Sequence, residues 1–377
     1  MYIKCKNIYC ENKIIDGFIE YKDGKIKDIL GSGEIVTEYE DFSECIIIPG
    51  IIDTHNHGCN GYNLMEEKVD DDYIHGYLKS LTEFGVTGVL PTLVETFDQL
   101  ENYCNYENRS DECELLGINM EGPYLHLNSS HDKKLKNSDI TYVKHLIDIG
   151  KNRIKVMSIA PDMDKSNEII DYLIEHKIIV SMGHSKMDEQ QCKKAITQGC
   201  SLATHIGNGM QGIHQRDIGT LGVCMLDDEL MVEMICDGKH ICYDMAKLIM
   251  KVKPKSKIII ISDGNCYTGL TAGVYPGMLN KDDLMYVTEE GEAKDKDGNM
   301  MGSSIPIIKA IRNFQSKNIA SLRDMIQMAC YNPAKFYGFL DRKGSIVKGK
   351  DADFVVLDLN LEVVRTYCRG NLVYSKY

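Results

Sequence analysis

The chain lacks any apolar run of about 18 residues, the length that a membrane-spanning helix requires. Its first twenty residues scatter charged side chains among apolar ones, so they contain no apolar core of a signal peptide. With 377 residues and 43% hydrophobic side chains, the chain can bury a large core. We therefore expect a globular, cytoplasmic protein.

Paired cysteine motifs are also missing. The 14 cysteines are irregularly spaced, and no two of them form a Cys-x-x-Cys pair. The chain is far longer than the small secreted domains that depend on disulfides. We expect reduced, mostly buried thiols.

Positive charge is scarce, because 43 Lys and Arg stand against 56 Asp and Glu, for a net charge of -13. A field of this sign repels nucleic acids and anionic membranes, so neither is expected as a partner. A small anionic substrate remains compatible with it if a local group of cations meets the anion.

No Pro- or Ser-rich linker and no low-complexity tract divides the chain. Short β segments fill residues 1–48 and return in residues 342–377, and Asp23-Gly24 is a hairpin signal. We predict that the two ends form one small, discontinuous β-sandwich domain. Residues 49–341 form the larger domain between them.

In this larger domain, apolar runs alternate with helical patterns. Residues 70–84 and 185–199 show helical spacing, and Ser185 and Gly199 are the expected caps of the second helix. Eight strands are predicted at residues 45–56, 85–94, 114–124, 153–161, 177–185, 201–207, 230–237 and 257–264. Eight β/α units predict an α/β fold, a TIM-type (β/α)8 barrel, whose chemistry lies at the carboxyl ends of the strands.

Imidazoles and carboxylates stand at five of these strand ends. The segment "IIDTHNHG" holds His55 and His57, which as residues i and i+2 of a strand point to one face. The other four are Glu121 in "NMEGPY", His184 in "SMGHS", His205 in "ATHIGNGM" and Asp263 in "ISDG". Each alone is most often a cap or a hydrogen-bonding residue, but six in one register predict a site for a metal such as Zn or Fe.

The chain resembles the amidohydrolase superfamily and, within it, the family of N-acetylglucosamine-6-phosphate deacetylases. The resemblance runs through the whole length. It is carried by "PGIIDTHNHG", "GVTGVLPT", "GINMEGPYL", "SIAPDMD", "VSMGHS", "ATHIGNGM", "ICDGKH", "IISDG", "MGSSIPIIKAIRNF", "YNPAKFYG" and "GSIVKGKDADFVVLD". The Glu-Gly-Pro, Gly-His-Ser and Thr-His-x-x-Asn-x-Met segments are more specific than the His-x-His pair.

The resemblance implies metal-dependent hydrolysis of the N-acetyl amide of N-acetylglucosamine 6-phosphate. Glu121 takes the metal-bridging position, joined by His184 and His205, and the presence of both His55 and His57 makes a second metal plausible. One or two divalent metals per chain are therefore expected. Asp263 is expected to take a proton from water and deliver it to the leaving amine. The alternative is that Asp263 is only a ligand.

Substrate-binding residues are also implied by the resemblance. Asn208 and Gly209 correspond to positions near the phosphate, Arg216 to a phosphate-contacting arginine and His240 to a histidine near the substrate carbonyl. Arginine suits a phosphate because its planar fork pairs with two oxygens. The alternative is that Arg216 is a solvated loop residue that can pair with Asp217. In the family some phosphate contacts cross a subunit boundary, so a homodimer is expected.

The sequence departs from the family after "EGPYL", where "HLNSSHDKK" replaces a Lys-Gly-Ala-His run and His131 takes the place of its last residue. Asp162 stands where Glu is common, and Cys266 lies near Asp263. These changes leave open a different N-acyl sugar or a cyclic amide as the substrate. A non-catalytic barrel is the remaining alternative; loss of a ligand would indicate it, and no ligand is lost.

Overall fold

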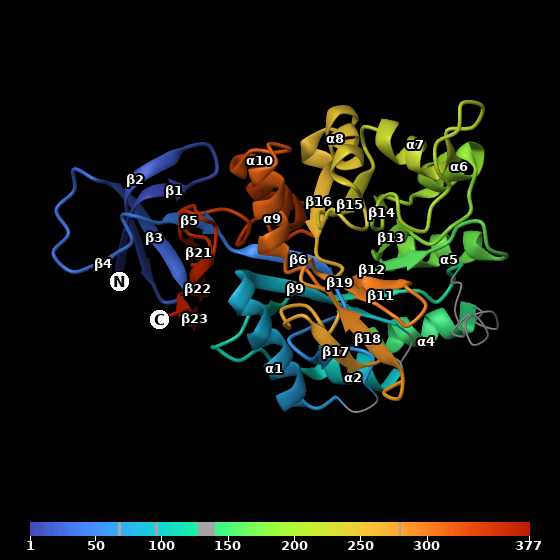
Figure 1. Ribbon diagram of the computed structural model, residues 1–377, viewed down its shortest axis with the longest axis horizontal. Coiled ribbons are helices and arrows are strands. Elements are labelled where there is room, and N and C mark those ends of the chain that lie inside the picture. The colour runs from blue at the N-terminus through green and yellow to red at the C-terminus, as the bar shows by residue number, and fades with distance from the viewer. Residues whose placement is uncertain (67–68, 95–96, 127–139, 279) are drawn as a thin grey trace.

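The computed structural model describes residues 1–66, 69–94, 97–126, 140–278 and 280–377. Figure 1 shows a small β domain that carries both termini at one end of a larger body of strands and helices. No helix among the described residues has the length and apolarity to cross a membrane.

The strands of the two chain ends share one hydrogen-bonded sheet, in the order β23-β22-β21-β5-β1-β2-β3 with β4 beside β1. They are β1 Tyr2–Tyr9, β2 Ile14–Lys22, β3 Lys25–Gly31, β4 Glu40–Asp41, β5 Ile46–Pro49, β21 Phe354–Leu357, β22 Val363–Cys368 and β23 Asn371–Ser375. The antiparallel pair β21–β5 joins the end of the chain to its beginning. Asp23 and Gly24 make the predicted turn between β2 and β3, both with positive φ as an Asp-Gly hairpin turn requires.

The predicted (β/α)8 barrel is confirmed. Its parallel strands are β6 Ile51–Asn56, β9 Val86–Leu93, β10 Glu114–Leu115 with β11 Ile118–Glu121, β12 Ile154–Ile159, β13 Ile179–Met182, β14 Leu202–Ala203, β15 Met231–Ile235 and β16 Ile258–Ile261. They follow one another around the ring, and a bridge between Asn56 and Gly264 joins β6 to the segment after β16.

Helices lie between and around these strands (Figure 1). They are α1 Asp71–Leu81, α2 Phe97–Asn105, α4 Ile140–Gly150, α5 Ser166–Glu175, α6 Glu189–Gln198, α7 Gly219–Leu226, α8 Tyr243–Val252, α9 Ile307–Ser316, α10 Leu322–Ile326 and α11 Asn332–Phe336, with the short turns η1 Thr82–Phe84, η2 Lys255–Lys257 and η3 Gln327–Tyr331. The predicted helix 70–84 is α1 with η1, capped by Asp70. The predicted cap Ser185 is wrong, because Asp188 forms a capping box with Gln191 and starts α6 there.

Two predicted strands are interrupted, and one is shorter than expected. Residues 45–56 form β5 in the small sheet and β6 in the barrel, separated at Gly50, where a Cβ atom would lie 2.0 Å from Thr87 Oγ1. Residues 114–124 are divided at Gly117, and only Leu202–Ala203 of the predicted strand 201–207 pairs. The alternation of apolar residues does not show which sheet a strand joins, so these breaks could not be predicted from it.

A sheet that the sequence pattern does not predict lies between β16 and α9. Its antiparallel strands are β17 Gly273–Pro276, β18 Leu284–Val287, β19 Glu292–Lys294 and β20 Met300–Ser303. A small hairpin of β7 Gly58–Cys59 and β8 Tyr62–Asn63 follows β6. A bridge from Ser303 to Gly264 joins the sheet to the end of β16. Its strands have only three or four residues each, so any alternation in them is too short to be recognised.

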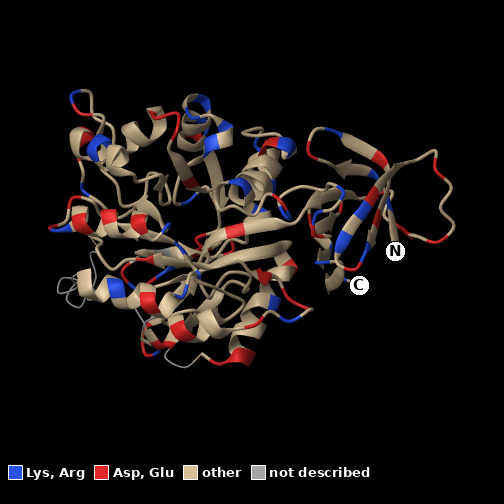
Figure 2. Cartoon of the chain, turned by 180° about the vertical axis from the view of Figure 1, so that it is seen from behind, with Lys and Arg blue, Asp and Glu red and all other residues tan. Residues whose placement is uncertain are grey.

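Apolar side chains of the barrel strands pack against one another inside the ring, among them Ile52, Leu90, Val156, Met231 and Ile259. This packing is typical of the filled interior of such barrels, and it supports the polar side chains at the strand ends. Figure 2 shows acidic and basic residues interspersed over the outer helices and the small domain. In that view, therefore, the negative net charge does not gather on one face.

Candidate metal centre

The structure brings all six strand-end residues together at the carboxyl end of the barrel. One group is His55, His57 and Glu121, and the other is Glu121, His184 and His205. Within each group one nitrogen or oxygen from every residue lies within 4.8 Å of the others. Glu121 at the end of β11 therefore belongs to both groups.

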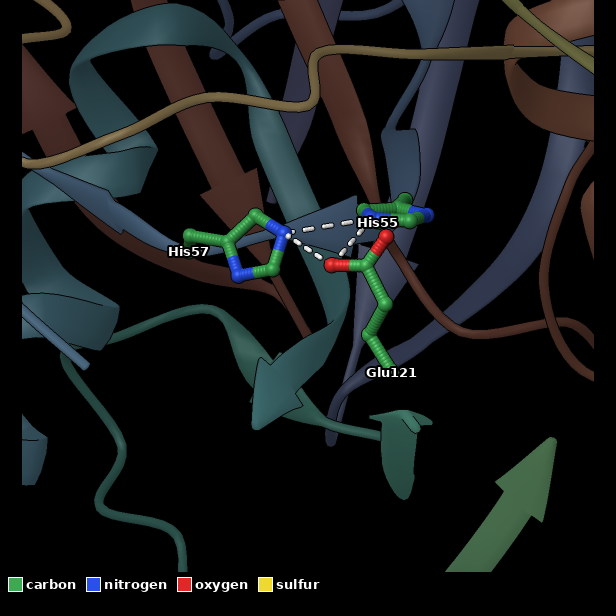
Figure 3. A group of neighbouring side chains, drawn as sticks. All are labelled: His55, His57 and Glu121. Carbon is green, nitrogen blue, oxygen red and sulfur yellow. Dashed lines mark hydrogen bonds and ion pairs between the residues drawn. The ribbon is translucent and has the colours of Figure 1, made fainter. Parts of the chain in front are cut away.

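In the first group the two imidazoles face each other, with Nε2 atoms 3.2 Å apart. Figure 3 shows the Glu121 carboxylate beside them, with Oε2 at 3.1 Å from His57 Nε2 and 3.9 Å from His55 Nε2. β6 ends at Asn56, so His57 lies just beyond the strand, yet both rings reach the same point. His55 and His57 are both buried.

In the second group the other oxygen of Glu121 is the common atom. Oε1 lies 3.1 Å from His184 Nε2 and 3.3 Å from His205 Nε2, and these two nitrogens are 3.1 Å apart. The two oxygens of one carboxylate thus each face a pair of histidines. This is the arrangement of a bridging ligand.

Asp263 follows β16 and faces the first group. Its Oδ1 lies 3.5 Å from His55 Nε2 and 3.4 Å from His57 Nε2. Its backbone N–H donates to the His55 carbonyl, which ties the ends of β6 and β16 together. Asp263 can therefore serve as a ligand or act on a molecule beside the ligands.

Three of the six residues have a left-handed backbone, with φ of 43° at His184, 31° at His205 and 47° at Asp263. This conformation is unfavourable for residues with a Cβ atom and costs of order 1–3 kcal/mol. The strain lies just beyond β13, β14 and β16, where each chain leaves its strand. Such strain is concentrated at functional sites, where it aims a side chain that regular structure would direct elsewhere.

The separations fit a metal. Nitrogen and oxygen ligands at about 2.0–2.2 Å from a tetrahedral ion lie about 3.3 Å from one another. Five of the contacts named above are between 3.1 and 3.3 Å, and two of them bring nitrogen to nitrogen. Neutral imidazole and carboxylate are the ligand types that Zn²⁺ and Fe²⁺ accept. The residues therefore fit one or two divalent ions.

The electrostatics favour a cation here. Burial opposes the charged form of His57, but hydrogen bonds to Asp263 and Glu121 outweigh it and raise its pKa to about 10. Burial also opposes the charged form of His55, but the hydrogen bond to Glu233 and the charges of Asp263 and Glu121 raise its pKa to about 9. Burial would raise the pKa of Glu121, yet the surrounding imidazoles hold it well below its usual range. The carboxylates that favour a proton on these rings favour a metal ion in the same place.

Sequence reasoning missed two buried carboxylates behind the site. Glu233, in the middle of β15, lies 3.1 Å from His55 Nδ1. Asp237, just after β15, accepts hydrogen bonds from His240 Nδ1 at 2.6 Å and from the backbone N–H groups of Lys239 and His240. Two features of the sequence could have indicated them: the single charge inside the apolar strand "MVEMI" for Glu233, and the motif "ICDGKH" for Asp237.

The expected substrate-binding residues are only partly gathered around the ligands. Asn208 donates from Nδ2 to the carbonyl of His205, and a Cβ atom on Gly209 would lie 2.9 Å from His184 Nδ1. Burial lowers the pKa of His240, but the hydrogen bond to Asp237 and its charge outweigh burial and raise it. The charge of Asp263 also raises this pKa. His240 is thereby held beside the site, with Nδ1 turned to Asp237.

Arg216 is exposed at the tip of a tight turn between His214 and Asp217, in the loop before α7. Its guanidinium pairs with no carboxylate among the residues that the structure describes, so the suggested pair with Asp217 is absent there. Asp217 instead accepts from the backbone of Gly219. His131 lies outside the described residues.

The two other departures lie close to the ligands. Asp162 accepts from the backbone N–H of Lys186 and contacts His126 Nε2 at 3.0 Å. The backbone N–H of His126 in turn donates to the carbonyl of His184. Cys266 is buried, and burial raises the pKa of its thiol to about 11, so it stays neutral near pH 7.

Comparison with known proteins gives one consistent result. The model of the amidohydrolase family matches residues 46–373. N-acetylglucosamine-6-phosphate deacetylase from Bacillus subtilis is 31% identical to this chain, and the alignment covers 99% of this chain and 97% of the relative. The enzyme of the same name from Lysinibacillus sphaericus is 30% identical, and the alignment covers 93% of this chain and 92% of the relative. The crystal structure of N-acetylglucosamine-6-phosphate deacetylase from Thermotoga maritima superposes with a TM-score of 0.80 and 26% identity over all of both chains. The chain therefore belongs to the amidohydrolase family.

Proposed function

We propose that this chain hydrolyses the N-acetyl amide of N-acetylglucosamine 6-phosphate, giving glucosamine 6-phosphate and acetate. The observation that carries the proposal is the carboxylate of Glu121 between two pairs of histidines, with Asp263 beside one pair. The names of the two bacterial relatives support the choice of substrate, because their similarity spans nearly the whole chain.

One or two divalent metal ions, Zn²⁺ or Fe²⁺, are part of this proposal. His55, His57 and Glu121 would hold one ion, and Glu121, His184 and His205 the other. Asp263, beside His55 and His57, would be a further ligand. When bound, such an ion polarises the amide carbonyl and lowers the pKa of water to about 7.

Asp263 performs the proton transfers. Its carboxylate takes a proton from the attacking water and then gives it to the amine nitrogen, so that a neutral amine leaves. Burial alone would raise the pKa of Asp263, but the hydrogen bond from His57 and the neighbouring imidazoles hold it below its usual range. Asp263 is thus an ionised base before the reaction starts.

Other residues bind the sugar. His240, oriented by Asp237, contacts the substrate near its carbonyl. Arg216 pairs with the phosphate, and Asn208 and Gly209 lie near it. Arg216 is free for this role because its guanidinium has no carboxylate partner in the described part of the chain. His131 is a further candidate for contact with the substrate.

We also propose a homodimer in which the partner subunit contributes to the phosphate site, and a cytoplasmic location. The exposed position of Arg216 on a loop supports the first, since an exposed fork can meet a ligand held between two chains. All 14 cysteines are free, which supports a reducing compartment.

The test is acetate release from a panel of N-acetylglucosamine and N-acetylgalactosamine, each with and without a 6-phosphate, plus a cyclic amide. We expect N-acetylglucosamine 6-phosphate to have the highest kcat/KM. Arg216→Ala should raise KM for that substrate by about tenfold to several hundredfold, because a charge-assisted pair contributes about 1.5–3 kcal/mol, and should barely change the unphosphorylated sugar. Preference of the wild type for an unphosphorylated sugar or the cyclic amide contradicts the proposal.

A further inference from the structure

Glu233 is a carboxylate buried in the wall of the barrel. It lies in the middle of β15, and its residue is 1% exposed. Burial of an unpaired carboxylate is strongly unfavourable, so its contacts identify its role. Oε2 lies 3.1 Å from His55 Nδ1, and Oε1 accepts a hydrogen bond from Thr54 Oγ1 at 3.2 Å. Both contacts are to β6, the strand that carries His55.

The contact with Glu233 decides which nitrogen of His55 carries the proton. A carboxylate only accepts, so Nδ1 is the N–H donor, and in the neutral ring that a metal requires the lone pair of Nε2 faces His57 and Glu121. The Nδ1 atoms of His57 and His205 are buried without a partner among the described residues. Of the four imidazoles, His55 is the one whose Nδ1 is held by a side chain that the structure describes.

We propose that Glu233 is a positioning residue for the metal ion that His55 and His57 hold. It fixes the tautomer and the ring orientation of His55, and it places a negative charge behind the ligand. The inference rests on the proposed metal centre and adds to it a residue outside the ligand set. Outer partners of this kind typically change metal affinity by about 10- to 100-fold.

The test is Glu233→Gln, which keeps the size of the side chain but removes its charge. The amide can also donate to Nδ1, which puts the proton on Nε2 and blocks that ligand. Metal-depleted protein is titrated with Zn²⁺ against a chromophoric chelator, and with Co²⁺ while its visible absorption is followed. His55→Asn identifies which metal equivalent depends on His55. We expect Glu233→Gln to weaken that equivalent by about 10- to 100-fold and to leave the other unchanged.

Glu112→Gln is the matched control. Glu112 is another fully buried carboxylate that contacts a histidine, with Oε2 2.6 Å from His75 Nδ1. It lies just before β10, at the amino end of the barrel strands, away from the metal ligands. The control should bind both metal equivalents like the wild type. Glu233→Asp keeps the charge but shortens the reach, so it should weaken the same equivalent by a smaller factor even if Glu233→Gln does not fold.

Wild-type affinity for both equivalents in the Glu233 variants overturns the inference. Equal weakening of both equivalents also overturns it, because Glu233 would then stabilise the barrel in general. A wild-type protein that binds no metal through His55 overturns it together with the two-metal form of the proposed function. No substrate enters these measurements, so a wrong choice of sugar leaves their result intact.

Discussion

Two buried clusters of charged side chains in the described part of the molecule differ in how their charges are satisfied. One is the metal centre described above. The other, here called the junction cluster, lies where the barrel meets the small domain and consists of Glu114, Arg342, Lys343, Asp351 and Asp353. Arg342 binds Glu114 with both ends of its guanidinium, and Lys343 contacts Glu114 at 2.8 Å and also Asp353.

In the junction cluster every carboxylate has a cation, so the cluster is complete by itself and serves to hold the two domains together. In the metal centre nitrogen faces nitrogen at 3.2 Å and 3.1 Å, and two carboxylates converge on the same space. A single cation among them can satisfy those lone pairs together. Convergence of ligand atoms of one kind, rather than burial or charge, therefore distinguishes a functional cluster from a structural one.

The largest expected effect is on the chemistry of the metal centre. Asp263→Asn removes the proposed proton carrier but leaves the other five candidate ligands, so it should lower kcat by about 100- to 10,000-fold while most of the metal is retained. Steady-state kinetics and metal analysis of the same preparation check this. An unchanged kcat would remove Asp263 from the mechanism.

Breaking the junction cluster should affect stability alone. Lys343→Met leaves the buried carboxylate of Asp353 without its cation and should lower the free energy of unfolding by about 3–5 kcal/mol, with metal content and kcat unchanged. Denaturant unfolding measures this. Lys348→Met is the control, since its pair with Asp28 is exposed and should contribute less than about 1 kcal/mol. Loss of metal in Lys343→Met would refute the division between the two clusters.

A steric change at Gly209 tests whether metal binding depends on a contact with His184 or on backbone strain in general. Gly209→Ala places a Cβ atom 2.9 Å from His184 Nδ1, so it should displace that ligand and weaken the metal held by His184 and His205 by about 10-fold or more. Gly338→Ala also has a positive φ, 79°, but open space around the new atom. It should bind metal normally. Equal metal loss in both variants would show that strain, not contact, is responsible.

The junction cluster should also respond to pH. Burial opposes ionisation of Glu114, but Arg342 and Lys343 outweigh it and lower its pKa from 4.5 to about 2. Its contribution is therefore complete above about pH 4.5 and is lost as the pH falls towards 2. The difference in free energy of unfolding between the wild type and Glu114→Gln should be constant from pH 6 to 7. It should shrink as the pH falls from about 4.5 towards 2. A difference that grows as the pH falls contradicts the assigned direction.

The barrel and the meeting of the six candidate ligand residues were predictable from the sequence, because each of these residues stands at the end of a predicted strand. His55, Glu121 and His205 could be placed at one mouth as soon as eight strands were counted. The helix start at Asp188 was not predicted correctly, since Ser185 is an equally good cap by residue type. The division at Gly50 depends on a close approach to Thr87 that sequence periodicity does not contain.

The supporting residues of the site were harder to find than its ligands. Glu233 lies in β15 and meets His55 across the barrel, 178 residues away in the sequence, so only the closed fold reveals the pair. The left-handed backbone at His184 and His205 is likewise a result of how the chain leaves each strand. Short motifs identify the side chains that perform chemistry, whereas their positioning depends on contacts between distant strands.

We propose that the cluster at the carboxyl end of the barrel is a metal centre with Glu121 as its bridging ligand. Its most direct test is elemental analysis of purified wild-type protein beside Glu121→Gln, both after incubation with Zn²⁺, Fe²⁺, Mn²⁺ or Co²⁺ and removal of free ions. We expect one or two divalent ions per wild-type chain and a clear loss in Glu121→Gln. Wild-type protein without stoichiometric metal, or a Glu121→Gln variant that retains the full amount, would contradict the claim.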